Sequence, residues 1–468
     1  MRQPFFRKIM SSVNKSKKID MTQGSIIRNV FLFAVPIVIA NILQQLYTTV
    51  DTLVIGNFCG AASLAAVGTS AQPVEVLLCV FLGIGSGVSI LVSQYIGAGD
   101  SGRIKTTCAT AISFVYMVGI PIGVVGWLAA PLLLRIMGVP EDAYGAALSY
   151  TRIVFMGSLG NIGYNMNAGI LRGMGDSKAS LWFLVVSCVS NIVLDLVFVA
   201  GMGMDVSGAA LSTSIAMYIS WVISIIYIKK KFPELSFTFI PRELSGHELK
   251  RILSLGLPMG LNNSLYSLGH VAMQTLINAQ GSTFMAGASI AGRITGVSSI
   301  AITAMSQASS TFSGQNYGAG KTERLREGYI KLPLAAGLIT VAMGALMIVF
   351  RMPILGLFNK DPEVLMYASR YVCVILVSQW AFAVFNNINN FVNGVGKVRF
   401  TTVINLLMLW AVRIPSAYII NRFFDGTWVM VGTAISFYFG MICMLTYILF
   451  SKSWKTAVNI GNDPAGVR

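Results

Sequence analysis

A short stretch of membrane-like sequence occurs twice in this chain, about half a chain apart. Residues 94–100 read Gln-Tyr-Ile-Gly-Ala-Gly-Asp, and residues 315–321 read Gln-Asn-Tyr-Gly-Ala-Gly-Lys, 221 positions later. The same offset, within one residue, relates Pro36 to Pro258, Gly173 to Gly394 and Gly175 to Gly396. The chain is therefore expected to fold as two copies of one unit.

The composition shows what kind of unit is repeated. The chain is 55% hydrophobic and 11% charged, with a mean hydropathy of +0.70, whereas soluble domains carry roughly 25% charged residues. These values indicate a polytopic membrane protein. A spanning helix needs about 20 apolar residues, which predicts twelve helices, over residues 29–55, 64–93, 106–128, 146–168, 180–200, 207–228, 252–278, 287–313, 330–350, 364–390, 401–420 and 428–450.

The basic residues are distributed unevenly between the two sides of the membrane. Of the 34 Lys and Arg residues, 26 fall in the tails and loops on the side of the N-terminus, with Lys331 at the adjoining end of its helix included, and four fall in the opposite loops. Positive charge marks the cytoplasmic side, so both termini of this multi-pass protein are expected in the cytoplasm. The net charge of +16 is then a topology signal and does not indicate nucleic-acid binding.

Six helices per copy is an even number, so both copies enter the membrane from the same side. The expected fold is an all-α membrane protein, with two six-helix bundles related by a pseudo-two-fold axis along the membrane normal. Parallel repeats of this kind are found in secondary transporters, with the substrate site between the halves. The expected parts are a cytoplasmic tail at 1–24, an N-lobe at 25–228, a cytoplasmic loop at 229–250, a C-lobe at 251–452 and a cytoplasmic tail at 453–468.

Several functions are excluded by what the sequence lacks. No G-x-x-x-x-G-K-[ST] motif occurs, so nucleotide-driven transport is not expected. The six cysteines show no metal-ligand spacing, and the two histidines, His247 and His270, are far apart. We therefore expect neither an enzyme nor a cofactor, and a monomer is sufficient.

Two roles are expected for glycine. Small residues let membrane helices approach closely, and we assign this role to glycines 83, 85, 87, 157, 160 and 163. Glycine also caps helices, which is the role expected for the Gly-Ala-Gly at 97–99 and at 318–320.

Three acids lie in predicted membrane helices, where an ionisable group is costly and is functional by default. They are Asp51, Glu75 and Asp195, all in the first half. Glu75 lies close to the outer end of its helix, and it is either a cavity residue or a side chain that reaches water.

Polar residues accompany two of these acids at helical spacing. Gln44, Tyr47 and Thr48 share the face of Asp51; Ser187, Asn191 and Asp195 are spaced by four; and the next helix supplies Thr213. If these helices meet, two carboxylates, an amide and a hydroxyl form a site for Na+, or the two carboxylates share a proton. In the alternative, Asp51 and Asp195 are only structural and pair with arginines such as Arg152.

The other half of the chain is basic where the first half is acidic. Arg293, Arg370 and Arg413 lie in its predicted helices, and to them we assign structural pairing or the shaping of a cavity. We place Tyr266, His270 and Arg293 among the residues that line a substrate cavity, together with Gln44, Tyr47, Thr48, Glu75 and Ser187. Pro36 and Pro258 interrupt the first helix of each half at matching places, which indicates paired hinges.

The order of these motifs resembles that of the multidrug and toxic compound extrusion (MATE) transporters. The resemblance covers residues 26–450 and includes Ala34-Val35-Pro36, Val50-Asp51-Thr52, Leu171-Arg172-Gly173-x-Gly175-Asp176 and Asn191-Ile192-Val193-Leu194-Asp195. It implies antiport in which lipophilic, mostly cationic compounds are exported in exchange for H+ or Na+ by alternating access.

The likeness is greatest to the DinF-type branch of that family. That branch implies a coupling-ion site at Asp51, Asn191, Asp195 and Thr213. The NorM-type branch has acids in the seventh and tenth helices, where this chain has Asn262-Asn263 and Asn386. The alternative function is that of a flippase for lipid-linked precursors in the same superfamily, which the intramembrane arginines favour.

Overall fold

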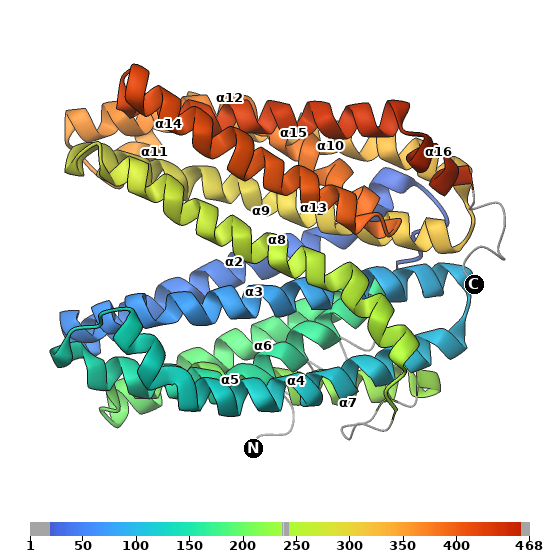
Figure 1. Ribbon diagram of the computed structural model, residues 1–468, viewed down its shortest axis with the longest axis horizontal. Coiled ribbons are helices and arrows are strands. Elements are labelled where there is room, and N and C mark those ends of the chain that lie inside the picture. The colour runs from blue at the N-terminus through green and yellow to red at the C-terminus, as the bar shows by residue number, and fades with distance from the viewer. Residues whose placement is uncertain (1–18, 236, 238–242, 460–468) are drawn as a thin grey trace. The chain divides into compact units, whose positions relative to one another are not determined.

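The computed structural model describes residues 19–235, 237 and 243–459, and every regular element in that part of the chain is helical (Figure 1). The long helices of the first half are α2 (Ile26–Phe58), α3 (Gly60–Ala98), α4 (Ser101–Ile136), α5 (Glu141–Gly173), α6 (Ser177–Asp195), which continues as the π-helix η1 (Leu196–Gly201), and α7 (Asp205–Lys231). Those of the second half are α8 (Gly246–Asn278), α9 (Ser282–Gly318), α10 (Thr322–Val349), α12 (Pro362–Gly394), α13 (Val398–Leu406) continued by the π-helix η3 (Leu407–Arg413) and α14 (Ile414–Phe423), and α15 (Met430–Phe450). Short elements are η2 (Pro233–Leu235), α11 (Arg351–Gly356), η4 (Gly426–Trp428) and α16 (Lys452–Asn459).

The prediction of an all-α membrane fold is confirmed. Ten helical segments of the described chain are both long and apolar enough to cross a bilayer. The other two long helices, α5 and α8, have 33 residues each and carry more polar side chains. Most helices run several residues past the apolar windows that predicted them, because helix formation continues to the capping residues after the apolar run has ended.

The chain divides into two compact units. Unit 1 contains Val35–Leu261, and unit 2 contains Asp20–Ala34 together with the chain from Asn262 onward. Helix α2 therefore starts in unit 2 and continues into unit 1, and helix α8 does the reverse. In each helix the division falls within a few residues of a proline, Pro36 or Pro258.

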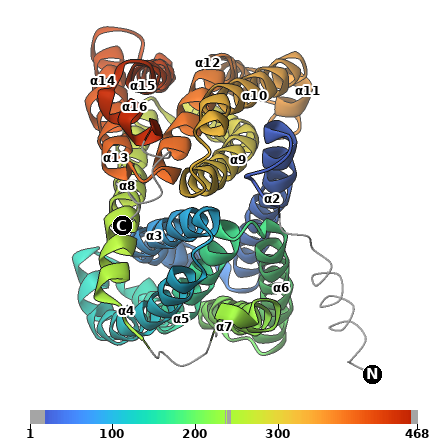
Figure 2. The ribbon, with the colours of Figure 1, turned by 90° about the vertical axis from the view of Figure 1, so that its right-hand side faces the viewer.

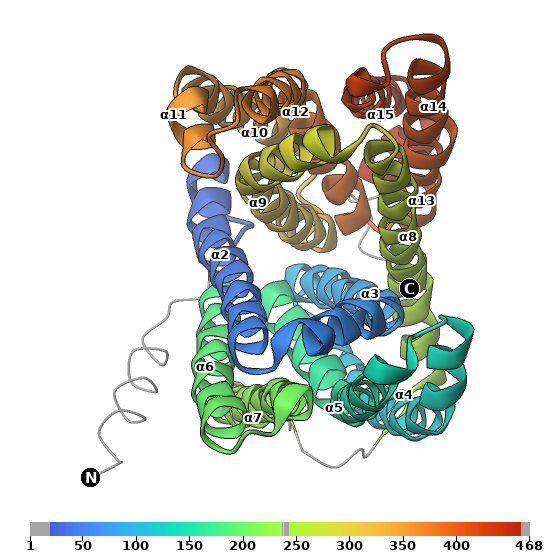
Figure 3. The same cartoon turned by 90° about the vertical axis from the view of Figure 1, so that its left-hand side faces the viewer.

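Each unit is built around one central helix. In unit 1, α5 packs against α3, α4 and α7; in unit 2, α12 packs against α9, α10 and α15 (Figure 2, Figure 3). The two central helices begin at Glu141 and Pro362 and end at Gly173 and Gly394, which are 221 positions apart at both ends. The sequence repeat therefore places corresponding helices, α5 and α12, at the centre of their units.

The duplicated glycines end helices in both units. Gly99 and Gly320 have φ of 69° and 66°, and Gly175 and Gly396 have φ of 86° and 94°. Only glycine adopts this left-handed backbone without strain, so the capping role predicted from the sequence is confirmed. After the first-half glycines, Asp100 and Asp176 also cap the next helix by accepting a hydrogen bond from a backbone N–H.

The predicted packing role of the intrahelical glycines is confirmed as well. A Cβ placed on Gly83 would lie 2.1 Å from the backbone nitrogen of Gly260, and one on Gly87 would lie 2.6 Å from the Cα of Gly256. The two Gly-x-x-x-Gly pairs therefore bring α3 and the first part of α8 into backbone contact. Glycines 157, 160 and 163 play the same part toward Ser214, Tyr218 and Trp221 of α7.

Each copy of the repeated seven-residue motif forms hydrogen bonds at the start of a long helix, α2 in unit 2 and α8 in unit 1. In unit 2, Gln315 accepts a hydrogen bond from the N–H of Met21 (3.1 Å), and Asn316 donates to the carbonyl of Met21 (3.0 Å), just before α2. In unit 1, Tyr95 donates to Glu248 (3.0 Å), in the first turn of α8. The motif recurs because each copy anchors the entry of one helix.

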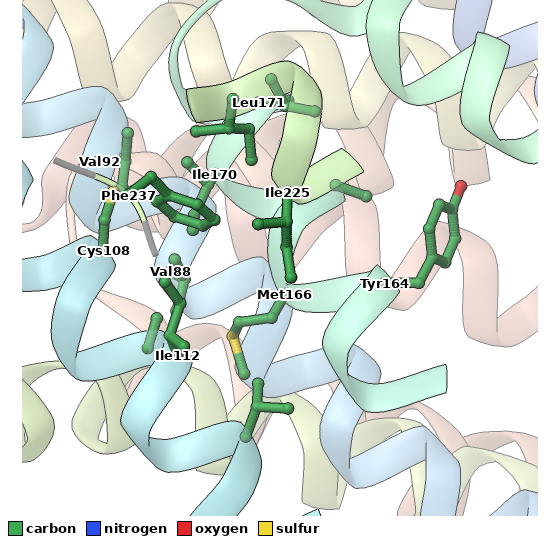
Figure 4. Close-up of a cluster of buried hydrophobic side chains, with 14 of the residues drawn as sticks. Val88, Val92, Cys108, Ile112, Tyr164, Met166, Ile170, Leu171, Ile225 and Phe237 are labelled. Atoms are coloured by element: carbon green, nitrogen blue, oxygen red, sulfur yellow. The ribbon is translucent and has the colours of Figure 1, made fainter. Parts of the chain in front are cut away.

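The core of unit 1 is a continuous apolar cluster between α3, α4, α5 and α7. Figure 4 shows part of it, formed by Val88 and Val92, Cys108 and Ile112, Met166, Ile170 and Leu171, and Ile225. Since lipid is as apolar as these side chains, close van der Waals packing is what stabilises the bundle. Polar residues in such a bundle need a separate explanation.

Candidate functional site

Polar side chains of α2, α6 and α7 meet inside unit 1. The face of α6 that bears Ser187, Asn191 and Asp195 is turned inward, and these residues are 3%, 1% and 0% exposed. Asp51 lies on α2, and Thr213 lies on α7. The spacing by four on α6 therefore places its amide and its carboxyl on one buried face.

Thr213 is the centre of the neutral part of this cluster. Its hydroxyl oxygen lies 3.2 Å from the hydroxyl of Tyr47 and accepts a hydrogen bond from Nδ2 of Asn191, also at 3.2 Å. Three helices are thereby joined through one hydroxyl. The carbonyl oxygen Oδ1 of Asn191 is buried and has no hydrogen-bond donor, so it is free to bind a cation.

The two carboxyl groups of the cluster interact with each other. Asp51 lies near enough to Asp195 for their charges to interact. Both oxygens of Asp195 and Oδ1 of Asp51 lack a donor. The neighbouring hydroxyl of Ser212 does not supply one of good geometry, because it donates to the carbonyl of Gly208 at 2.8 Å.

No arginine or lysine neutralises this pair in the part of the chain that the structure describes. The sequence offered Arg152 as a structural partner. Its guanidinium instead lies over the ring of Trp127, 4.3 Å from the centroid, and its Nε makes no hydrogen bond. The half-buried carboxyl of Asp51 and the buried carboxyl of Asp195, without a counter-charge, are stable only when they hold a proton or a cation.

The oxygen atoms present suit either of these. Carboxylate, amide and hydroxyl oxygens are ligands for hard cations, and two adjacent carboxyls share a proton readily. The described residues contain no group of three or more His, Cys, Asp or Glu residues that could hold a metal ion.

The remaining residues predicted to line a cavity lie in several places. Gln44 and Thr48 are exposed on α2, where Thr48 donates to the carbonyl of Gln44 (2.9 Å). The hydroxyl of Ser187 contacts the sulfur of Met217 at 3.8 Å. Glu75 is on α3, but its side chain lies outside the described residues.

The second-half cavity residues belong to unit 2. Tyr266 and His270 are neighbours on α8, with ring centroids 4.9 Å apart. Arg293 is exposed on α9. Tyr266 accepts a hydrogen bond from Arg413 (3.0 Å), a contact that the sequence did not indicate.

Two features of the cluster in unit 1 were not predicted. The π-helix η1 begins directly after Asp195, and π segments inside helices are frequent at functional sites. Tyr150, on the central helix α5, lies near enough to Asp51 to interact with its charge. Neither feature leaves a pattern in the sequence, because a π turn has no residue signature and Tyr150 resembles any other membrane tyrosine.

Comparison with known proteins assigns the chain to a family. The MatE family model matches twice, over residues 36–197 and 258–419, two segments 222 positions apart. The probable multidrug resistance protein YpnP of Bacillus subtilis is 30% identical over 440 residues, which cover 94% of this chain and 98% of that protein. The probable multidrug resistance protein YoeA of the same organism is 29% identical over 449 residues, which cover 93% and 95%.

Solved structures show the same fold. An outward-facing multidrug resistance MATE family transporter of the MOP superfamily superposes with a TM-score of 0.87 at 22% identity, over 95% of this chain and 99% of that one. A MOP superfamily transporter from Pyrococcus furiosus gives 0.83 at 23% identity, over 96% and 99%. The chain belongs to the MatE family of multidrug and toxic compound extrusion proteins, and is thus a membrane transporter and not an enzyme.

Proposed function

We propose that this protein is a secondary antiporter that exports lipophilic, cationic organic compounds in exchange for H+ or Na+. Asp51 and Asp195 bind the coupling ion, and Asn191 and Thr213 are its neutral ligands. The observation that supports this most strongly is the pair of carboxyls in unit 1, the half-buried Asp51 and the buried Asp195, without a basic partner among the described residues.

Exchange follows from the charge of the site. An empty pair of carboxylates inside the bundle is unfavourable, so the pair binds an ion from the side where that ion is abundant. A cationic compound and the coupling ion stabilise the same negative site, so binding of one favours release of the other. Reciprocal coupling of this kind is the thermodynamic condition for antiport.

The proposed moving element is the first helix. Asp51 is on α2, whose proline, Pro36, lies next to the point where the helix passes from one unit to the other. Loading Asp51 would change the packing of α2 on α6 and α7 and bend the helix at Pro36, while Pro258 would serve the corresponding part of α8. The two units would then alternate their access to the two sides of the membrane.

The substrate class rests on the relatives. YpnP and YoeA are named as probable multidrug resistance proteins, and the cationic character of the exported compounds is proposed from the acidic site at Asp51 and Asp195. We place the protein, as a monomer, in the bacterial inner membrane with both termini in the cytoplasm, in accord with its basic loops.

Reconstitution into liposomes tests the proposal. Efflux of a fluorescent lipophilic cation is recorded under a pH gradient alone and under a Na+ gradient alone, with Asp51→Asn/Asp195→Asn as the uncoupled control. Efflux driven by one gradient in the wild type and lost in the double variant is the expected result. Folded wild-type protein that responds to neither gradient, but moves a labelled lipid-linked sugar across the bilayer, would establish the flippase function instead.

A further inference from the structure

Unit 2 contains a buried arginine whose hydrogen bonds are incomplete. Arg413 is the last residue of η3 and is 3% exposed. Its Nε donates to the hydroxyl of Ser436 (3.0 Å), and its Nη1 donates to the hydroxyl of Tyr266 (3.0 Å). Its Nη2 is buried and has no acceptor.

No carboxylate contacts this arginine in the described chain. The acidic residues of unit 2 after Asn262 that the structure describes all lie at helix ends or between helices: Glu323, Glu327, Asp361, Glu363 and Asp425. Arg370 offers a comparison, because it reaches Asp425 at 3.9 Å and Thr427 at 3.3 Å. A buried charge without such a partner is strongly unfavourable.

The two hydroxyls beside Arg413 have different capacities. Ser436 gives its hydrogen to the carbonyl of Thr433 (2.7 Å), so it serves Arg413 only as an acceptor. Tyr266 accepts from Arg413, and its own hydrogen has no acceptor among the described residues. Nη2 of Arg413 and the O–H of Tyr266 are therefore two adjacent hydrogen-bond donors beside one positive charge. Neither has an acceptor among the described residues.

The backbone around Arg413 is built to allow this arrangement. A Cβ on Gly432 would lie 2.8 Å from the backbone nitrogen of Ala417 and 3.0 Å from the carbonyl oxygen of Arg413. Glycine there lets α15 approach α14 closely, and this brings Ser436, one turn further on, to the guanidinium. The wide turn η3 ends at Arg413, and the helix resumes with Pro415 in its first turn.

On the α8 side, the residues beside Arg413 are not fully buried. Tyr266 is half-buried, and its neighbour His270 is exposed. The guanidinium carbon of Arg413 lies 5.4 Å from the ring centroid of Tyr266 and 5.3 Å from that of Phe437. These two rings form an apolar wall beside the charge. An incoming group would therefore meet two donors and an aromatic wall.

We infer that Arg413 and Tyr266 form a binding site for a small monovalent anion, either chloride or the carboxylate of an organic molecule. Nη2 of Arg413 and the O–H of Tyr266 donate to it, and the positive charge of the arginine is neutralised. The inference goes beyond the proposed function, because it concerns unit 2 alone and holds whether or not Asp51 and Asp195 bind a coupling ion.

Thermal stabilisation of the purified full-length protein tests the site, since a ligand that binds the folded state raises the melting temperature. Sodium chloride and, separately, sodium benzoate replace sodium sulfate at constant Na+ concentration. A saturable rise is expected in the wild type and in the control Arg370→Met. We expect Arg413→Met to abolish the rise and Tyr266→Phe to weaken the apparent affinity by about tenfold, as loss of one hydrogen bond to a charged group does.

The two anions distinguish the sources. A rise with chloride alone assigns the site to an inorganic ion, and a rise with benzoate assigns it to a carboxylate. A flat response to both anions in the wild type would overturn the inference, and so would an equal response in the wild type and in Tyr266→Phe. The Tyr266→Phe variant tests the proposed anion site even if Arg413→Met does not fold.

Discussion

At the level of single residues, the chain places opposite charges in its two halves, and no described residue neutralises either of them. Within the described residues, unit 1 holds the half-buried Asp51 and the buried Asp195 without a base, and unit 2 buries Arg413 without an acid. Structural ion pairs would place the charges together. Charges left unpaired in a membrane are functional by default, which agrees with the ion sites proposed for both units.

Substitution of Asp51 by Asn separates a functional role from a structural one. Asn keeps the size of the side chain and removes a charge that lacks a partner, so we expect a melting temperature equal to or above that of the wild type. Gradient-driven efflux should fall by at least about tenfold, since the charge that binds the ion is lost. A clearly lowered melting temperature with retained efflux would show that Asp51 only supports the bundle.

Thr213 is expected to tune the affinity of the same site. Thr213→Val removes the oxygen that contacts Tyr47 and Asn191, and it should raise the coupling-ion concentration for half-maximal efflux by about five- to tenfold, equivalent to roughly one hydrogen bond. Thr213→Ser is the matched control and should behave as the wild type. An unchanged half-maximal concentration in Thr213→Val would remove Thr213 from the site.

The sequence could predict these acids but not their whole surroundings. The spacing by four on α6 put Ser187, Asn191 and Asp195 on one face, because helical periodicity alone decides that. It could not distinguish which residues of α2 face α7, and only Tyr47 of the polar stripe on that helix reaches Thr213. The contact between Arg413 and Tyr266 joins residues 147 positions apart, and such a pairing depends on tertiary packing.

At the level of elements, glycines determine how closely the helices pack. Gly83 and Gly87 on α3 face Gly260 and Gly256 on α8, with backbone against backbone. In a bilayer this closeness replaces the hydrophobic effect as the source of helix association. Helix positions could be predicted from the apolar runs, whereas the two π segments could not, because they depend on local packing and not on composition.

A pair of glycine substitutions checks this packing. Gly83→Ala places a Cβ 2.1 Å from the backbone of Gly260, so α3 and α8 must separate. We expect the melting temperature in detergent to fall by several degrees, about what 1–3 kcal/mol of overpacking would produce. Gly292→Ala on α9 meets no atom within 4 Å and is the control; equal melting temperatures for the two variants would contradict the packing account.

At the level of the whole molecule, the duplication explains most of what the sequence predicted. Matched glycines, matched central helices and matched anchoring motifs recur at an offset of 221, because the helices of each copy pack in the same arrangement. The charges inside the helices have diverged between the copies. The arrangement of the helices could therefore be predicted from the repeat. The roles of the charged residues inside the helices could not, because they differ between the two copies.

The topology that follows from the basic loops can be measured. In a variant without its six native cysteines, a single cysteine at Arg135 should react with a membrane-impermeant maleimide in intact cells. A single cysteine at Lys397 should react only after permeabilisation. The reverse pattern would invert the orientation and place the termini outside.

The central claim is that one site in unit 1 exchanges a coupling ion for a cationic compound. The most direct measurement is ion release when a lipophilic cation is added to the purified, ion-loaded protein, followed with a pH indicator for H+ and with labelled Na+ in a parallel sample. We expect stoichiometric release of one of these ions from the wild type and none from Asp51→Asn/Asp195→Asn. Binding of the compound without release of either ion, or equal release from the double variant, would contradict it.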